Sequence, residues 1–181
     1  MTTNEIFGWF NDNHKEALTE LIKKHQVKTV IEIGSFLGKS TAFIAKQVDK
    51  VVCIDPFVFW EDKDRPNGDV AAYGGEDFFD KFWANMTTEG VSQKLEIHRG
   101  TSVDSLAVVT NLNPNGVDLV YIDGLHDYES VLQDIKLYHS QANKVICGDD
   151  YDENWPGVVK AVNEYYEDDV KHNGNFWYVI K

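Results

Sequence analysis

The sequence has few cysteines, a minority of basic residues and no long hydrophobic run. Its only two cysteines, Cys53 and Cys147, each lie inside an apolar segment, so we expect two reduced, buried thiols rather than a disulfide. The 17 basic residues stand against 30 acidic ones, which gives a formal net charge of -13. This charge repels nucleic-acid phosphates and anionic membrane surfaces, so neither nucleic acid nor membrane is an expected partner.

No apolar run approaches the roughly 18 residues that a membrane-spanning helix needs. The first residues lack the basic and then apolar layout of a signal peptide, and there is no internal repeat. We therefore expect a cytoplasmic protein. The 181 residues suit a single domain over 1–181 with a substantial core, divided into an N-terminal helical region (1–28) and an α/β core (29–181).

Short apolar, β-branched runs alternate with segments of helical periodicity along the chain. Strands are predicted over 29–33, 51–54, 95–98, 117–122, 144–147, 170–171 and 176–181. Helices are predicted over 4–25, 41–48, 76–86, 102–110 and 128–139, and from Pro156 onward. This alternation predicts a doubly wound α/β fold, with a mainly parallel sheet covered on both faces. The Asn-Gly pair before the last strand predicts a tight reversal, and hence an antiparallel C-terminal strand.

Acidic residues stand at or near the ends of the predicted strands. They are Glu32, Asp55, Asp123, Asp149 and Asp150. Ligands of such folds bind beyond the carboxyl ends of the strands, which makes this set a candidate site. The alternative is that these are only solvated loop charges.

A glycine turn follows the first predicted strand and spans Gly34 to Gly38. A phosphate-binding P-loop needs four residues between its glycines, whereas this turn has three, although Gly38-Lys39-Ser40 otherwise fits. A dinucleotide fingerprint needs a glycine at position 36, which is Phe36. The third interpretation is a cofactor without phosphates and with a cationic end, beside which the Glu32 carboxylate is favourable.

This pattern resembles the class I S-adenosylmethionine-dependent methyltransferases, which have a Rossmann-like fold. Their first motif, acid-x-Gly-x-x-x-Gly, is matched by Glu32, Gly34 and Gly38, and the acid that ends their second strand is matched by Asp55. The resemblance implies S-adenosylmethionine as cofactor. It also implies that the ribose hydroxyls donate hydrogen bonds to Asp55, since a carboxylate can accept from both.

The same resemblance assigns further cofactor contacts. Phe36 and Ser40 would contact the methionine end of the cofactor. The loop 99–104 looks like the adenine-flanking loop, with Ser102 near the base.

Three acids suggest a metal site if the two strands that they follow are neighbours. Asp123 would then meet Asp149 and Asp150 at one sheet edge, and carboxylates that close together need a proton or a cation. Oxygen ligands suit Mg²⁺, or alternatively Mn²⁺ or Ca²⁺, better than zinc. Asp123 is expected to serve both this metal and the cofactor side.

Within the methyltransferases, the three acids resemble those of the metal-dependent O-methyltransferases that act on catechols and macrolide sugars. His126, three residues after Asp123, and the run 155–162 look like the sugar-methylating branch. We expect His126 to be the general base, since an imidazole accepts a proton near neutral pH. The other histidines, among them His14, have no comparable context and are taken as structural or solvated.

The resulting hypothesis is an enzyme, a divalent-metal-dependent O-methyltransferase that acts on a small-molecule hydroxyl, first a sugar and second a catechol-like diol. The aromatic segment 56–75 would either close over the substrate or fold onto the core. Two alternatives stay open: a nucleotide-phosphate enzyme that uses Gly38-Lys39-Ser40, and a non-catalytic binding domain. A homo-oligomer is compatible with the sequence.

Overall fold

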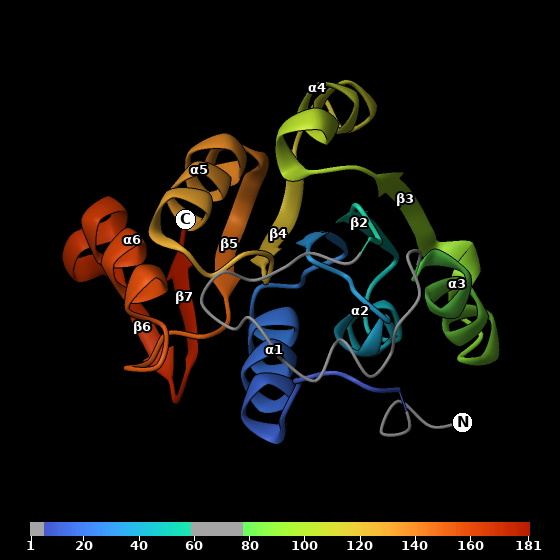
Figure 1. The fold of residues 1–181 in the computed structure, drawn as a ribbon, viewed down its shortest axis with the longest axis horizontal. Helices are drawn as coiled ribbons and strands as arrows, with labels where there is room; N and C mark the ends of the chain where they lie inside the picture. Colours follow the sequence, from blue (N-terminus) through green and yellow to red (C-terminus); the bar gives the residue numbers. More distant parts are fainter. Residues whose placement is uncertain (1–5, 59–77) are drawn as a thin grey trace.

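The structure is a computed structural model that describes residues 6–58 and 78–181. Within these residues, a seven-stranded sheet forms the centre of the protein (Figure 1). The strands lie in the order β3-β2-β1-β4-β5-β7-β6. Their bounds are β1 Thr29–Ile33, β2 Lys50–Asp55, β3 Leu95–Arg99, β4 Val117–Ile122, β5 Ala142–Gly148, β6 Lys171–Asn173 and β7 Phe176–Ile180. The first five pair in parallel, whereas β7 is antiparallel to both of its neighbours.

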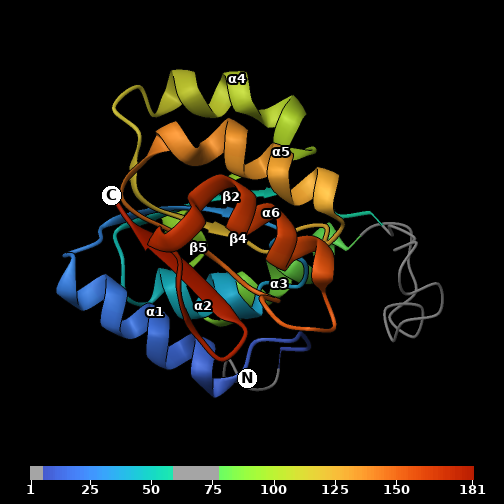
Figure 2. The same cartoon turned by 90° about the vertical axis from the view of Figure 1, so that its left-hand side faces the viewer.

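In the part of the chain that the structure describes, six α-helices cover the two faces of this sheet. Their bounds are α1 Asp12–Lys24, α2 Lys39–Ala45, α3 Phe79–Thr88, α4 Ser102–Leu112, α5 Tyr128–Tyr138 and α6 Pro156–Tyr166. One core cluster joins α1, α2 and α3 to the first face, and a second joins α4, α5 and α6 to the other. Figure 2 shows the two layers from the side, with α4 and α5 above the sheet and α1 and α2 below it. Apolar burial on both faces explains why the central strands are almost continuously apolar.

The parallel register brings the ends of five strands to one edge of the sheet. Ile33 at the end of β1 pairs with Ile54 on one side and with Ile122 on the other. Ile122 in turn pairs with Gly148 at the end of β5. The segments that follow β1, β2, β4 and β5 therefore leave the sheet side by side, which is where ligands bind in such folds.

The predicted fold class is confirmed, including the antiparallel C-terminal strand and its reversal at Asn173 and Gly174. The start predicted for the first helix, at residue 4, is wrong. Asn11 caps α1, because its side chain accepts from the His14 backbone N–H and the His14 ring accepts from the Asn11 backbone N–H. The helix therefore begins at Asp12, and residues 6–10 are not helical.

Both cysteines are free and buried, as predicted. Within the described ranges no helix is long and apolar enough to cross a membrane. Of the aromatic segment 56–75, Phe57 is fully buried and packs against Phe79 and Phe82 of α3. Phe59, Trp60 and Tyr73 lie outside the described residues.

Candidate active site

The glycine turn after β1 is pressed against the end of β4. Gly34 has a φ of +90°, and a Cβ atom there would lie 1.9 Å from the Asp123 carbonyl oxygen. Phe36, also at positive φ, follows within the turn, and Gly38 at +88° caps α2. Glycine at position 34 is thus required both by the left-handed backbone and by lack of space.

Glu32 lies in β1, two residues before Gly34, and it is fully buried. One of its carboxylate oxygens accepts from the Ser40 hydroxyl at 2.6 Å, and the other accepts from Ser35 at 2.8 Å and from Thr41. Burial raises the pKa of the Glu32 carboxyl, and the three hydroxyls offset part of that rise. Two predicted cofactor residues, Glu32 and Ser40, are therefore bonded to each other and fix the shape of the turn.

Asp55 ends β2 next to this turn. Its two carboxylate oxygens accept from the backbone N–H groups of Phe36 at 2.8 Å and Phe57 at 2.6 Å. Burial raises the pKa of the carboxyl, and these two bonds lower it again. The carboxylate is held in place, and each oxygen keeps a further lone pair for a ligand.

Ser102 begins α4, beyond the end of β3. Its hydroxyl donates to the buried carboxylate of Asp134 in α5, and its carbonyl oxygen accepts from the Tyr138 hydroxyl at 2.7 Å. Burial raises the pKa of Asp134 to about 6. The helix α5 thereby anchors the loop that was predicted to flank adenine.

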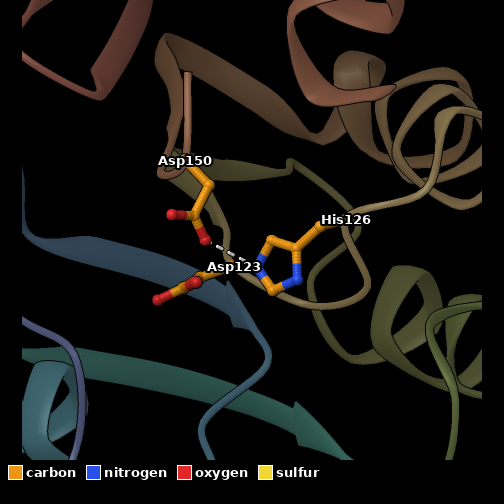
Figure 3. Close-up of side chains that lie close together, drawn as sticks. All are labelled: Asp123, His126 and Asp150. Atoms are coloured by element: carbon orange, nitrogen blue, oxygen red, sulfur yellow. Dashed lines mark ion pairs between the residues drawn. The ribbon is translucent and has the colours of Figure 1, made fainter. Parts of the chain in front are cut away.

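Asp123, His126 and Asp150 form a compact group at the ends of β4 and β5 (Figure 3). One ligand atom from each lies within 4.8 Å of the others. The His126 Nε2 atom is 2.8 Å from an Asp150 oxygen, and the Tyr121 hydroxyl donates to Asp123 at 3.1 Å. Burial, and then the charges of Asp149 and Asp150, raise the pKa of Asp123 well above its ordinary value. A cation in this group would offset that carboxylate repulsion.

This group differs in one member from the three aspartates expected from the sequence. Asp149 is buried, and its Oδ1 atom faces His14 Nε2 at 2.9 Å and accepts from Asn175 at 2.9 Å. The same oxygen accepts the Asp150 backbone N–H at 2.5 Å. Asp149 is therefore not a member of the group and contacts it through the backbone N–H of Asp150. His126, which we expect to act as a base, is a member of the group.

The donor set fits a divalent cation. Two carboxylates and an imidazole nitrogen are ligands that Mn²⁺ and related ions accept, and the carboxylates alone suit Mg²⁺. The His126 Nε2 atom is buried and makes no aligned hydrogen bond among the described residues, despite its closeness to Asp150. A buried polar atom without a bond partner is costly, so a cation or a substrate hydroxyl at this point would satisfy it.

Three contacts in this region were not predicted from the sequence. His14 and Asn175 bond Asp149 from opposite ends of the chain, and Trp155 packs on the His126 ring. In the sequence, the Trp155-Pro156-Gly157 run carries only a likeness to the sugar branch. Neither His14 nor Asn175 carries any local signal in the sequence.

Comparison with known proteins decides the family. The family model of the methyltransferase domain matches residues 31–151, which include the glycine turn and all three acids of the β4 and β5 ends. The chain belongs to this family. The predictions of a methyltransferase and of its Rossmann-like fold are thereby confirmed.

A curated relative and several solved structures resemble this methyltransferase. An uncharacterized protein of Acanthamoeba polyphaga mimivirus is 31% identical over 159 residues, which cover 84% of this chain and 65% of that protein. The chain thus spans slightly less than two thirds of the length of that curated relative.

The solved structures share the fold at low sequence identity. An O-methyltransferase from Bacillus cereus in complex with SAH has a TM-score of 0.67 and 17% identity, covering 94% of this chain and 82% of its own. The tomaymycin-synthesis O-methyltransferase of Streptomyces achromogenes, in complex with SAM, has a TM-score of 0.65, 16% identity and coverages of 94% and 81%. A TDP-rhamnose 3'-O-methyltransferase of calicheamicin biosynthesis has a TM-score of 0.64, 16% identity and the same coverages.

Proposed function

We propose that this methyltransferase transfers a methyl group from S-adenosylmethionine to a hydroxyl of a small molecule, with a divalent cation at the acidic group. The observation that carries the proposal is the contact between the glycine turn and the β4 end, where the carbonyl of Asp123 faces Gly34. This contact puts the expected cofactor turn and the acidic group next to each other, as a transfer between two ligands requires.

The order of the strands supports the placement of the cofactor. The methionine end would lie at the turn after β1, next to Gly34 and Phe36. The ribose would lie at Asp55, whose carboxylate is held by two backbone N–H groups. The adenine would then lie beyond β3, next to Ser102.

In the reaction, the acceptor oxygen forms a bond to the methyl carbon while the bond from that carbon to sulfur breaks. When bound, S-adenosylmethionine would supply the electrophilic methyl group, and a divalent cation held by the acidic group would supply positive charge to the acceptor hydroxyl. His126 accepts the hydroxyl proton at Nε2, and the rigid strand ends hold the two reactants in line. For this role Nε2 must stay free of the cation. The proposed cation ligands are therefore Asp123 and Asp150, together with Asp149, the third acid expected from the sequence.

A sugar hydroxyl is the proposed acceptor, and a catechol-like diol is the second candidate. The support is the position of His126 three residues after Asp123, together with the run 155–162. The TDP-rhamnose methyltransferase among the structural relatives agrees with this choice. We also propose a cytoplasmic location, and a homo-oligomer stays compatible with the chain.

The structure does not favour the nucleotide-phosphate alternative. The Lys39 amine, which a P-loop would direct at phosphates, donates instead to the Gly8 carbonyl oxygen at 2.7 Å. The Ser40 hydroxyl, which would bind Mg²⁺ there, donates to Glu32.

A thermal melting screen with S-adenosylhomocysteine, ATP, NAD and Mg²⁺ tests the proposal. At roughly 100 times its Kd, S-adenosylhomocysteine should stabilise the fold by about 2.7 kcal/mol. For a chain of this length we expect a rise in Tm of roughly 5–10 °C. A shift with ATP and none with S-adenosylhomocysteine would overturn the proposal, and binding of neither would favour a non-catalytic domain.

A further inference from the structure

We propose that His14 and Asn175 are positioning residues for the acidic group, and that they act through Asp149 and the turn after β5. The inference rests on the proposed function, because it assigns these two residues a role in cation binding. It goes beyond that function by including the N-terminal helix and the β6–β7 hairpin in the site.

His14 is held rigidly in a defined orientation. Only 1% of the residue is exposed, and its ring packs between Phe10 and Phe176, with centroid distances of 5.6 Å and 6.0 Å. Its Nδ1 atom accepts the Asn11 backbone N–H in the capping box of α1. This bond assigns the ring proton to Nε2, the atom that faces Asp149 Oδ1 at 2.9 Å.

Asn175 holds the same turn at two points. Its side-chain amide donates to Asp149 Oδ1 at 2.9 Å, and its backbone carbonyl oxygen accepts the Tyr151 N–H at 2.8 Å. Its side-chain oxygen also lies 3.0 Å from His14 Nε2. The residues on either side of Asp150 are therefore fixed from outside the turn.

Asp149 passes this restraint on to Asp150. The Oδ1 atom that faces His14 and Asn175 also accepts the Asp150 backbone N–H. Asp150 has a φ of +59°, a left-handed conformation that is uncommon outside glycine and is kept only where the surroundings impose it. In this conformation its carboxylate lies 2.8 Å from His126 Nε2. Loss of His14 or Asn175 would thus free the backbone at Asp150, whose conformation directs the Asp150 carboxylate toward His126.

Outer partners of this kind matter for cation affinity. Residues that orient the ligands of a metal typically change its affinity by roughly 10- to 100-fold when they are removed. A purely structural histidine would affect the stability of the protein and leave its cation affinity unchanged. Cation affinity therefore separates the two roles.

The experiment measures Mn²⁺ binding by the EPR signal of the free ion and S-adenosylhomocysteine binding by calorimetry. His14→Phe keeps the ring volume, His14→Gln keeps a side-chain N–H donor, and Asn175→Ala removes the second clamp. His25→Phe, at the other end of the same helix, is the matched control. We expect His14→Phe and Asn175→Ala to weaken Mn²⁺ binding by roughly 10- to 100-fold, with His14→Gln recovering part of the loss. Cofactor affinity and the control should match the wild type.

Two results would overturn the inference in distinguishable ways. Wild-type Mn²⁺ affinity in both His14→Phe and Asn175→Ala would show that the contacts serve packing alone, and the proposed function would stand. Absence of Mn²⁺ binding by the wild-type protein would overturn the metal part of the proposed function and the inference with it. If His14→Phe fails to fold, as judged by lost S-adenosylhomocysteine binding, then His14→Gln and Asn175→Ala decide.

Discussion

The imidazole of His126 packs against the indole of Trp155, with ring centroids 4.3 Å apart and planes inclined by 32°. Trp155 is buried and directly precedes α6. Two residues on, a Cβ atom at Gly157 would lie 2.7 Å from the His126 carbonyl oxygen. The residues at the start of α6 therefore contact both the ring and the backbone of the proposed base and fix their positions.

Replacement of Trp155 tests this support. Trp155→Leu removes the aromatic face, and we expect turnover to fall by roughly 10- to 100-fold because the base is no longer held in place. Trp155→Phe should recover most of the rate, and S-adenosylhomocysteine affinity should stay unchanged in both. Trp83→Leu, at an exposed position of α3, is the control. Equal rates in the leucine and phenylalanine variants would contradict a positioning role.

Asp55→Asn tests the ribose contact. The amide keeps one oxygen, which can still accept from one of the two backbone N–H groups, of Phe36 or Phe57, but it removes the charged acceptor. Because a hydrogen bond to a charged group contributes about 1.5–3 kcal/mol, S-adenosylhomocysteine should bind roughly 10- to 100-fold more weakly by calorimetry. Asp49→Asn, just before the start of the same strand, should bind normally. Unchanged affinity in Asp55→Asn would place the ribose elsewhere.

Asp150→Asn tests the cation site without disturbing the backbone, since asparagine tolerates a left-handed φ. We expect Mn²⁺ affinity and turnover to fall sharply while S-adenosylhomocysteine still binds. Glu153→Gln in the following loop is the control. Activity should also vanish in excess chelator and return with Mg²⁺ or Mn²⁺. Full turnover in chelator would show that the acids serve another purpose.

His126→Ala separates a general base from a metal ligand. If His126 is the base, turnover should fall by roughly 10²–10⁴-fold while Mn²⁺ affinity is retained. If Nε2 instead holds the cation, Mn²⁺ affinity should fall together with turnover. An unchanged rate with the accepted substrate would leave His126 without a catalytic role.

Asp134→Asn should make the fold more stable at neutral pH. Burial raises the pKa of Asp134 from 3.8 to about 6, so the folded state binds this proton more tightly than the unfolded chain. From about pH 4 to about pH 6 the group therefore lowers stability as pH rises, and the cost persists above that range, reaching at most about 3 kcal/mol.

The measurement is the difference in unfolding free energy between Asp134→Asn and the wild-type protein at acidic and neutral pH, without cation or cofactor. Taking the difference removes the contributions of the other buried acids. The variant should gain on the wild type as pH rises. A difference that does not depend on pH would contradict the raised pKa.

The sheet was predictable because each central strand is a short β-branched run buried on both faces, a pattern that needs no long-range information. The start of the first helix was not, because the apolar residues Phe7 and Phe10 continue the helical spacing before the Asn11 cap. Capping chemistry, rather than periodicity, decides where α1 begins.

The candidate site was predictable only in part. Asp55, Asp123 and Asp150 stand at strand ends, which parallel pairing brings to one edge. The contact of His14 with Asn175 joins residues 161 positions apart and follows from how α1 packs against the hairpin. No spacing rule reports such a pair. The bond between Glu32 and Ser40 likewise depends on how tightly the glycine turn closes.

The contact between Gly34 and the Asp123 carbonyl has a thermodynamic consequence. The Asp123 N–H also donates to the Ile33 carbonyl oxygen at 2.8 Å, so the turn and the β4 end are joined on consecutive residues. A ligand that reshapes the turn must then alter the environment of Asp123. If binding of the nucleoside changes the affinity for the cation by some factor, then binding of the cation changes the affinity for the nucleoside by the same factor. The two ligands should accordingly bind cooperatively, so that the affinity for each depends on whether the other is bound.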